Sequence, residues 1–233
     1  MLVVYTAIIG GKGPDRLRPL PVARDPMGRP VKYVCFTDGF SFNFTDPPNP
    51  PGAPDWELRL PAWEHEDSPR RTARWHKVMA HQALAADAPH YSLWLDGSHQ
   101  LDVEPWSLVD RYLSRTAAIA TFKHCQRDCV YEEGKACVQL RKDDPAVIAR
   151  QLDRYRKEGV KPHAGLFETS VFLRRHHQRP EVDRFNELWW AEMTADSLRD
   201  QLSVNYAARK VGLPYNHVAG TRYKSPYFTF YPH

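Results

Sequence analysis

An aspartate directly follows an apolar segment in Leu93-Trp94-Leu95-Asp96-Gly97-Ser98. The apolar residues predict a buried strand that presents the Asp96 carboxylate at a sheet edge, and Gly97 would let a ligand approach the backbone. Hard divalent cations prefer such oxygen ligands and can neutralise a departing diphosphate. A second acid often stands two positions later, where this chain has Ser98. The alternative interpretation is an aspartate that caps the turn after a strand.

Basic side chains gather at residues 70–77. On a helix, the spacing i, i+4 and i+7 would place Arg70, Arg74 and Lys77 near one face. Guanidinium forks and an ammonium group suit a diphosphate. A solvated basic helix face is the alternative.

Two later segments carry further polar residues. Asp200 and Gln201 stand side by side at a predicted helix start, where they could hold sugar hydroxyls and stabilise charge, or simply form a favourable first turn. His217, Gly220 and Lys224 combine a metal ligand, a site of close backbone approach and a phosphate-binding cation. An irregular tail with a surface histidine is the alternative.

Four cysteines are present, at positions 35, 125, 129 and 137. His124 with Cys125, Cys129 and Cys137 could supply four zinc ligands, but the spacing differs from a Cys-x2-Cys knuckle. Reduced structural thiols are the favoured interpretation.

Apolar runs, which predict strands, alternate along the chain with signals for helix starts. The resulting strands and helices must position the candidate polar residues described above. Strands are predicted at residues 2–9, 31–36, 55–60, 91–95, 117–122 and 165–174. Helices are predicted at residues 68–86, 106–114, 145–157, 180–193 and 197–209, with a loop-like tail from 212. Ser68 is the expected N-cap of the first helix, and Asp143 or Asp144 that of the helix at 145–157. The alternation predicts an α/β fold: one domain with a mixed, mostly parallel central sheet flanked by helices. Asp38 and Asp96 would then lie at the carboxyl edge, where ligands bind.

The composition narrows the class of partner. The chain has 233 residues, 42% of them hydrophobic, and a formal charge of +4, which suits a small anionic ligand better than a nucleic acid. Its 7 Trp, 11 Tyr and 10 Phe suit either stacking on sugars or bases or an aromatic core. An apolar run long enough for a transmembrane helix is absent, and the apolar N-terminus lacks a basic leader, so we expect a cytoplasmic protein.

Several segments, taken in order, resemble the plant mucilage-related glycosyltransferase-like domain family, which also occurs in bacteria. They include Val34-Cys35-Phe36-Thr37-Asp38, Arg74-x-x-Lys77, Trp94-Leu95-Asp96-Gly97-Ser98, His124-x-x-Arg127-Asp128-Cys129, Gly165-Leu166-x-Glu168-Thr169 and Ser197-x-Arg199-Asp200-Gln201. This resemblance implies a GT-A fold, a nucleoside-diphosphate sugar donor and a divalent metal.

The chain is more distantly similar to the glycogenin-like retaining galactosyl- and glucosyltransferases. That similarity implies that Asp96, Ser98 and His217 bind Mn2+ or Mg2+ and that Asp200 and Gln201 hold the donor sugar. Two departures stand out: Ser98 replaces an acid, and one extra residue separates Gly220 from Lys224.

Together, these resemblances imply transfer of a hexosyl or related sugar, with retention, from a UDP-sugar to a glycan hydroxyl. A DNA-base acceptor, a non-catalytic binding module and an inverting reaction with a carboxylate base are the alternatives.

Residues 1–122 would bind the nucleotide, and residues 123–233 the donor sugar and acceptor. The expected catalytic residues are Asp96, Asp200 and Gln201. The expected donor-binding residues are Thr6, Ala7, Lys12, Asp38, Arg71, Arg74, Lys77, Gly97, Ser98, Gly220 and Lys224. The expected acceptor or sugar residues are His124, Arg127, Asp128, Glu132 and Glu168.

Overall fold

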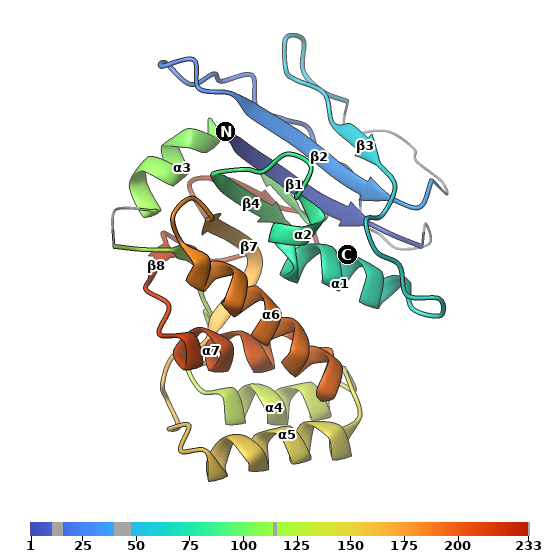
Figure 1. Ribbon diagram of the computed structural model, residues 1–233, viewed down its shortest axis with the longest axis vertical. Coiled ribbons are helices and arrows are strands. Elements are labelled where there is room, and N and C mark those ends of the chain that lie inside the picture. Colours follow the sequence, from blue (N-terminus) through green and yellow to red (C-terminus); the bar gives the residue numbers. More distant parts are fainter. Residues whose placement is uncertain (11–15, 40–47, 114–115, 233) are drawn as a thin grey trace.

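A computed structural model describes residues 1–10, 16–39, 48–113 and 116–232, so that Lys12 lies outside the described residues. Within these ranges, seven strands form one sheet in the order β3-β2-β1-β4-β7-β6-β8 (Figure 1). Their bounds are β1 Leu2–Ile8, β2 Val31–Thr37, β3 Glu57–Arg59, β4 Tyr91–Leu95, β6 Ile119–Lys123, β7 Phe167–Arg175 and β8 Tyr215–Val218. The predicted mixed, mostly parallel sheet flanked by helices is confirmed.

Strand β7 is antiparallel to both of its neighbours, β4 and β6, whereas the other adjacent pairs are parallel. Val171 of β7 pairs with Leu95, the last residue of β4. Because β7 enters the sheet from this end, residues 167–170 lie beyond the carboxyl end of β4. The reversed strand therefore delivers the residues at its start to the edge where the parallel strands finish.

Helices cover both faces of this sheet. Their bounds are α1 Pro69–Val78, α2 Ala80–Ala83, α3 Pro105–Tyr112, α4 Val130–Gln139, α5 Pro145–Lys157, α6 Pro180–Ala195 and α7 Asp200–Val211. One core joins the sheet to α1, α6 and α7, and a second joins it to α3 and the small sheet of β5 (His99–Leu101) and β9 (Phe228–Phe230). Figure 1 shows α4 and α5 stacked below α7, away from β1 to β3.

Local chemistry explains several helix boundaries. The Ser68 side chain accepts the Arg71 N–H at 3.2 Å, and the Asp144 side chain accepts the Ala146 N–H at 2.8 Å, so both act as the predicted N-caps. The predicted helix over 68–86 is instead broken after Val78. The buried Arg174 guanidinium donates to the Lys77 carbonyl at 2.9 Å and withdraws it from the helical hydrogen-bond ladder.

Two regions differ from the prediction made from the sequence. Residues 130–139 form α4, where no helix was predicted. Gly134 belongs in this helix because a Cβ there would lie 2.4 Å from the Leu152 side chain of α5. The tail is not simply a loop, because β8 and β9 pair with β6 and β5, which lie far away in the sequence. Within the described ranges, none of the helices combines the length and apolar character needed to cross a membrane.

Candidate active site

The carboxyl edge of the sheet holds a buried cluster centred on Lys77. The Lys77 ammonium, on α1, donates to Asp96 Oδ1 at 3.1 Å and to Asp200 Oδ2 at 2.7 Å. It also lies 3.2 Å from Thr169 Oγ1, which itself donates to Asp200 Oδ2 at 2.7 Å. The Lys77 side chain is only 1% exposed. Helix α1, the segment directly after β4, strand β7 and helix α7 each contribute one residue, so the cluster exists only when these parts of the fold have come together.

Both carboxylates of this cluster are held in the ionised form. Arg74 donates to Asp200 Oδ2 at 2.5 Å, and Trp94 Nε1 donates to Asp96 Oδ1 at 2.6 Å. Burial alone would raise both pKa values, but the charges of Lys77 and Arg74 outweigh it. They lower the pKa of Asp96 and hold that of Asp200 well below its usual range. The Asp96 side chain remains 31% exposed, so it is open to a ligand, whereas Asp200 is 3% exposed.

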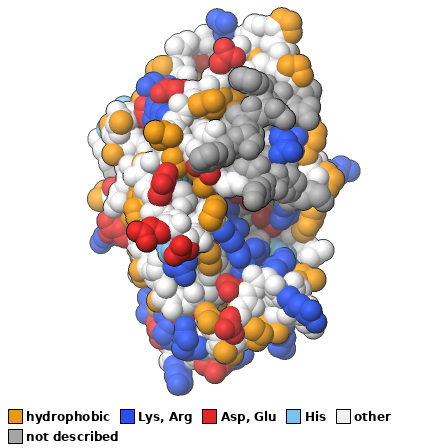
Figure 2. All heavy atoms as spheres, turned by 90° about the vertical axis from the view of Figure 1, so that its right-hand side faces the viewer, with side chains coloured by type: hydrophobic (Ala, Val, Ile, Leu, Met, Phe, Trp, Pro, Cys, Tyr) orange, Lys and Arg blue, Asp and Glu red, His pale blue; other side chains and the backbone are white. Residues whose placement is uncertain are grey.

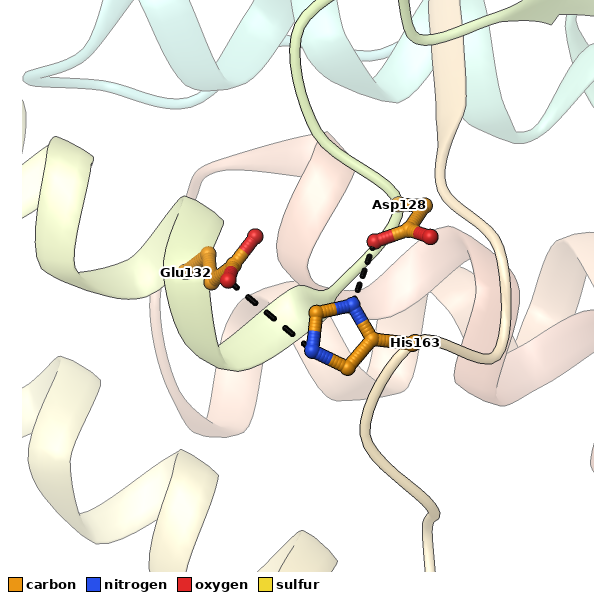
Figure 3. Close-up of side chains that lie close together, drawn as sticks. All are labelled: Asp128, Glu132 and His163. Atoms are coloured by element: carbon orange, nitrogen blue, oxygen red, sulfur yellow. Dashed lines mark hydrogen bonds and ion pairs between the residues drawn. The ribbon is translucent and has the colours of Figure 1, made fainter.

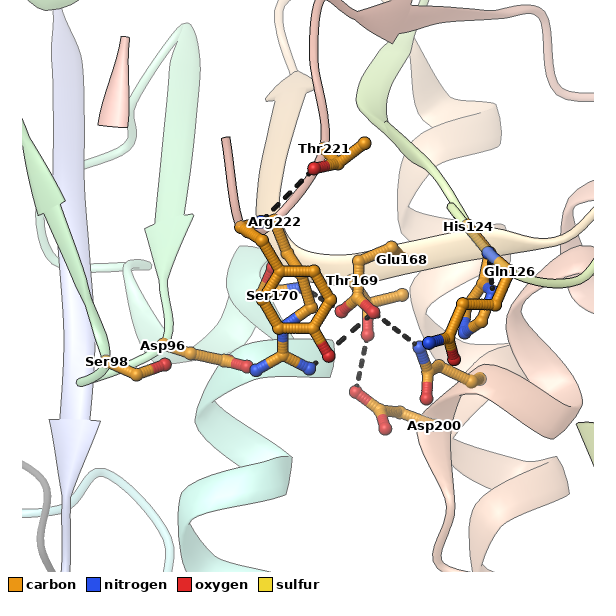
Figure 4. Close-up of polar contacts among 12 residues, drawn as sticks. Asp96, Ser98, His124, Gln126, Glu168, Thr169, Ser170, Asp200, Thr221 and Arg222 are labelled. Carbon is orange, nitrogen blue, oxygen red and sulfur yellow. Dashed lines mark hydrogen bonds and ion pairs between the residues drawn. The ribbon is translucent and has the colours of Figure 1, made fainter. Parts of the chain in front are cut away.

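Glu168 lies beside this cluster on the reversed strand. Its Oε2 accepts Gln201 Nε2 at 3.0 Å and lies 3.6 Å from Arg222 Nη1, and its Oε1 accepts the Ser170 N–H at 3.3 Å. Burial raises the Glu168 pKa, although the charge of Arg222 opposes the shift. Figure 4 shows Glu168 and Asp96 on opposite sides of the Arg222 guanidinium group. The predicted residues Asp96, Glu168, Asp200 and Gln201 thus come together.

Arg222 is a site residue that the sequence interpretation missed. It lies in a tight turn in which the Thr221 N–H donates to the Lys224 carbonyl at 2.8 Å. Gly220 permits this turn because its φ is +90° and because a Cβ would lie 2.5 Å from the Lys224 carbonyl oxygen. The turn leaves Lys224 exposed and directs Arg222 toward Glu168. The basic residue selected from the sequence is therefore two positions away from the one that reaches the cluster.

Three arginines near the beginnings of α1 and α7 form a basic rim beside the cluster: Arg70, Arg74 and Arg199. Burial, together with the positive charges of Arg74 and Arg199, lowers the pKa of Arg70. Arg199 Nε is buried without a hydrogen-bond partner among the described residues. Figure 2, which faces the right-hand side of Figure 1, shows Lys and Arg side chains gathered in a hollow. Like charges held together in this way favour an anionic ligand.

The expected metal ligands do not fit a divalent ion in this arrangement. Ser98 is buried, with its Oγ 3.2 Å from His99 Nδ1. His217 pairs with Thr121, three strand spacings or roughly 14 Å from the row of Trp94. Asp96 is instead engaged by the Lys77 ammonium group.

A second, exposed cluster lies at the start of α4. Figure 3 shows His163 between Asp128 and Glu132: its Nδ1 is 2.7 Å from Asp128 Oδ1, and its Nε2 is 3.9 Å from Glu132 Oε1. The Asp128 hydrogen bond raises the His163 pKa. Among the described residues, this is the one group of His, Cys, Asp and Glu side chains spaced to share an ion. The sequence interpretation selected both acids but missed His163, which only the fold brings to them.

His124 and Arg127 face another partner, the buried Glu133. Arg127 Nε donates to Glu133 Oε2 at 2.6 Å, and His124 Nε2 lies 3.7 Å from the same oxygen. The Cys137 thiol donates to Glu133 Oε1 at 3.5 Å, whereas Cys125 is exposed. Cys35, Cys129 and Cys137 are buried free thiols, and Cys125 is an exposed one.

The remaining predicted donor residues lie at or near the same edge in supporting positions. Asp38 Oδ2 accepts the Gly10 N–H at 2.6 Å and so links the ends of β1 and β2. The Gly97 carbonyl accepts Arg18 Nε at 3.1 Å. Thr6 and Ala7 are buried in β1, and Arg71 is half-buried on α1.

A family comparison identifies this α/β domain as glycosyltransferase-like. The family model described as TOD1/MUCI70, glycosyltransferase-like domain, matches residues 62–221. The chain belongs to this family, as the resemblance predicted. The match includes Lys77, Asp96, Glu168 and Asp200 and ends one residue before Arg222.

Two known proteins are similar to the chain. "Probable hexosyltransferase MUCI70" of Arabidopsis thaliana is 31% identical over 156 residues, which cover 63% of this chain and 26% of that protein. The chain thus spans about a quarter of the length of this relative. The structure titled "WbbM bifunctional glycosytransferase apo structure" has a TM-score of 0.47 and 13% identity, and the match covers 87% of this chain and 38% of that one.

Proposed function

We propose that this domain is a hexosyltransferase that moves a sugar from a nucleoside-diphosphate donor, UDP-sugar in our proposal, to a glycan hydroxyl. The observation that carries the proposal is the joining of ionised Asp96 and Asp200 with Lys77, beside Glu168 and Gln201, at the ligand-binding edge of the sheet. Family membership and the name of the Arabidopsis relative support the same reaction class.

The geometry suggests a role for each part of the site. The basic rim of Arg70, Arg74 and Arg199 suits the donor diphosphate, because guanidinium groups bind phosphate oxygens through paired hydrogen bonds. Asp96, whose side chain is 31% exposed, would accept hydrogen bonds from donor hydroxyls. Gln201, held by Glu168, would orient the sugar beside them.

Glu168 is the candidate general base. A base must accept the proton of the acceptor hydroxyl, and a carboxylate with a raised pKa does this better near neutral pH. Such a base is needed for inversion at the anomeric carbon. A retaining enzyme, which the resemblance to glycogenin-like proteins implied, needs no base on the acceptor. We favour inversion because Glu168 lies beside Gln201 and Arg222 at the same sheet edge as Asp96 and has a raised pKa. The anomeric configuration of the product, read by NMR, decides between inversion and retention.

The Asp96→Asn substitution tests the proposed reaction. It keeps the size of the side chain and removes the charge, so we expect UDP-sugar hydrolysis and transfer to fall by about a hundredfold or more, the scale of losing one preorganised electrostatic group. Circular dichroism should remain that of the parent protein. The matched control is Asp102→Asn, an exposed aspartate bonded to Thr229 in the small sheet. Full turnover by Asp96→Asn would contradict the proposal.

A further inference from the structure

We infer that fixed protein cations, led by the buried ammonium group of Lys77, take the place of a divalent metal ion at the donor diphosphate. The inference rests on the proposed function and adds how the leaving group is neutralised.

The surroundings of Lys77 Nζ are those of a bound cation. Three oxygens from three separate segments of the chain lie 2.7–3.2 Å away: those of Asp96, Thr169 and Asp200. The ammonium group thus bridges the carboxylates of Asp96 and Asp200, as a bound cation would. Its position is fixed from both ends, since the Lys77 carbonyl also accepts the Tyr5 hydroxyl at 3.2 Å and Arg174 Nη2 at 2.9 Å.

The charges around this ammonium group leave a positive surplus. Lys77 and Arg74 together balance the charges of Asp96 and Asp200. Arg70 and Arg199 of the basic rim remain, together with Arg222, and these three positive charges are opposed by two carboxylates, Asp143 and Glu168. Arg222 is 25% exposed, and its Nε is buried without a hydrogen-bond partner among the described residues. A diphosphate would supply the acceptors and negative charge that this rim lacks.

The donor set around Asp96 argues against a divalent ion in the same place. Such an ion would have to displace Lys77 from Asp96 and then remain close to its positive charge, which is unfavourable at a buried position. The other two ligands expected from the sequence face elsewhere: Ser98 contacts His99, and His217 lies on the far strand β8.

Binding measurements without turnover test the inference. UDP and inorganic pyrophosphate would each be titrated into metal-free protein with EDTA, and again with Mn2+, by calorimetry. Because free metal ions also bind these ligands, Mn2+ alone would be titrated in parallel and its free concentration read by electron paramagnetic resonance. We expect equal affinity with and without metal, within about twofold, and no tight Mn2+ site at the sheet edge.

Each other result has a distinct meaning. UDP binding that appears only with Mn2+ would overturn the inference and leave the proposed function standing. The absence of binding of UDP, other nucleotides and pyrophosphate under all conditions would overturn the proposed function and the inference with it.

Two variants sharpen the test. Lys77→Met removes the bridging charge and leaves Asp96 and Asp200 facing each other, so this protein should acquire Mn2+ binding and a Mn2+-dependent rise in melting temperature. Its control is Lys32→Met, because Lys32 forms an exposed ion pair with Asp87. A Lys77→Met protein that folds and ignores Mn2+ would count against the inference.

Arg222→Gln keeps the inference testable if Lys77→Met fails to fold. It should weaken metal-free pyrophosphate binding about tenfold or more, the scale of losing a charge-assisted hydrogen bond. Its control is Arg150→Gln, because Arg150 pairs with Asp196 on the outer side of α5. Unchanged affinity in Arg222→Gln would overturn the role assigned to this arginine.

Discussion

Two clusters of charged residues in this domain use similar side chains in different surroundings. The central cluster joins Lys77 to Asp96 and Asp200, and the lysine and Asp200 side chains are no more than 3% exposed. The outer cluster joins His163 to Asp128 and Glu132, and the histidine side chain is 60% exposed. Ion pairs that are removed from water interact strongly and keep a fixed geometry, whereas exposed pairs are screened. Burial, more than residue type, separates the candidate active site from an ordinary charged surface.

The largest expected effect comes from Asp200→Asn, which tests whether the central cluster depends on its charge balance. Removing this carboxylate leaves Lys77 and Arg74 under-compensated in a buried place, so we expect a loss of about 3–5 kcal/mol in the free energy of unfolding. The measurement is urea denaturation at neutral pH. The control is Asp153→Asn, because Asp153 is an exposed partner of Arg156, and its free energy of unfolding should stay close to that of the parent protein.

The same pair of proteins gives a pH test. The native state lowers the Asp200 pKa, so its carboxylate stabilises the fold above the usual aspartate pKa and loses this contribution as pH falls through the native value. The difference in the free energy of unfolding between the parent protein and Asp200→Asn should therefore shrink in strong acid. A constant difference across the acid range would mean that the charge is not what stabilises the cluster.

An intermediate effect, on the reaction and not on the fold, is expected for Glu168→Gln. Loss of the base should lower kcat by about a hundredfold to ten-thousandfold while UDP affinity is preserved. Because burial raises the Glu168 pKa, activity of the parent should fall on the acid side at a higher pH than an ordinary glutamate would give. Glu187→Gln, on the exposed side of α6, is the control. An acid limb that persists unchanged in Glu168→Gln would assign it to another group.

The smallest effect is expected in the outer cluster. Asp128→Asn removes the hydrogen bond that raises the His163 pKa, so NMR titration should show this pKa falling toward its usual value. Any stability from the pair is present below the usual histidine pKa and is lost as pH rises through the native one. We expect no measurable change in melting temperature at neutral pH and little change in turnover. A large loss of melting temperature or of turnover in Asp128→Asn would contradict the proposed difference between the two clusters.

Much of the architecture was predictable because local signals determine it. Apolar runs located β1, β2 and β4, and side-chain caps at Ser68 and Asp144 located two helix starts. The missed elements depend on distant partners. Helix α4 packs Gly134 closely against α5, and β8 pairs with β6 across nearly a hundred residues.

The site was predictable in part for the same reason. Asp96, Asp200 and Gln201 could be selected because they stand at the predicted ends of elements. The contribution of Thr169 depends on the reversed direction of β7, which the pattern of apolar residues does not reveal. Arg222 could not be separated from its basic neighbour Lys224 without knowing which way the turn at Gly220 faces.

The sequence separation within the central cluster has a consequence for biosynthesis. Lys77 and Asp200 are 123 positions apart, and the ion pair between them is buried. During synthesis, Lys77 therefore leaves the ribosome long before Asp200 does. Until α7 emerges, the ammonium group must stay hydrated, and the surrounding layers cannot close over it. The nascent domain therefore acquires its ligand-binding edge only after α7 has been synthesised.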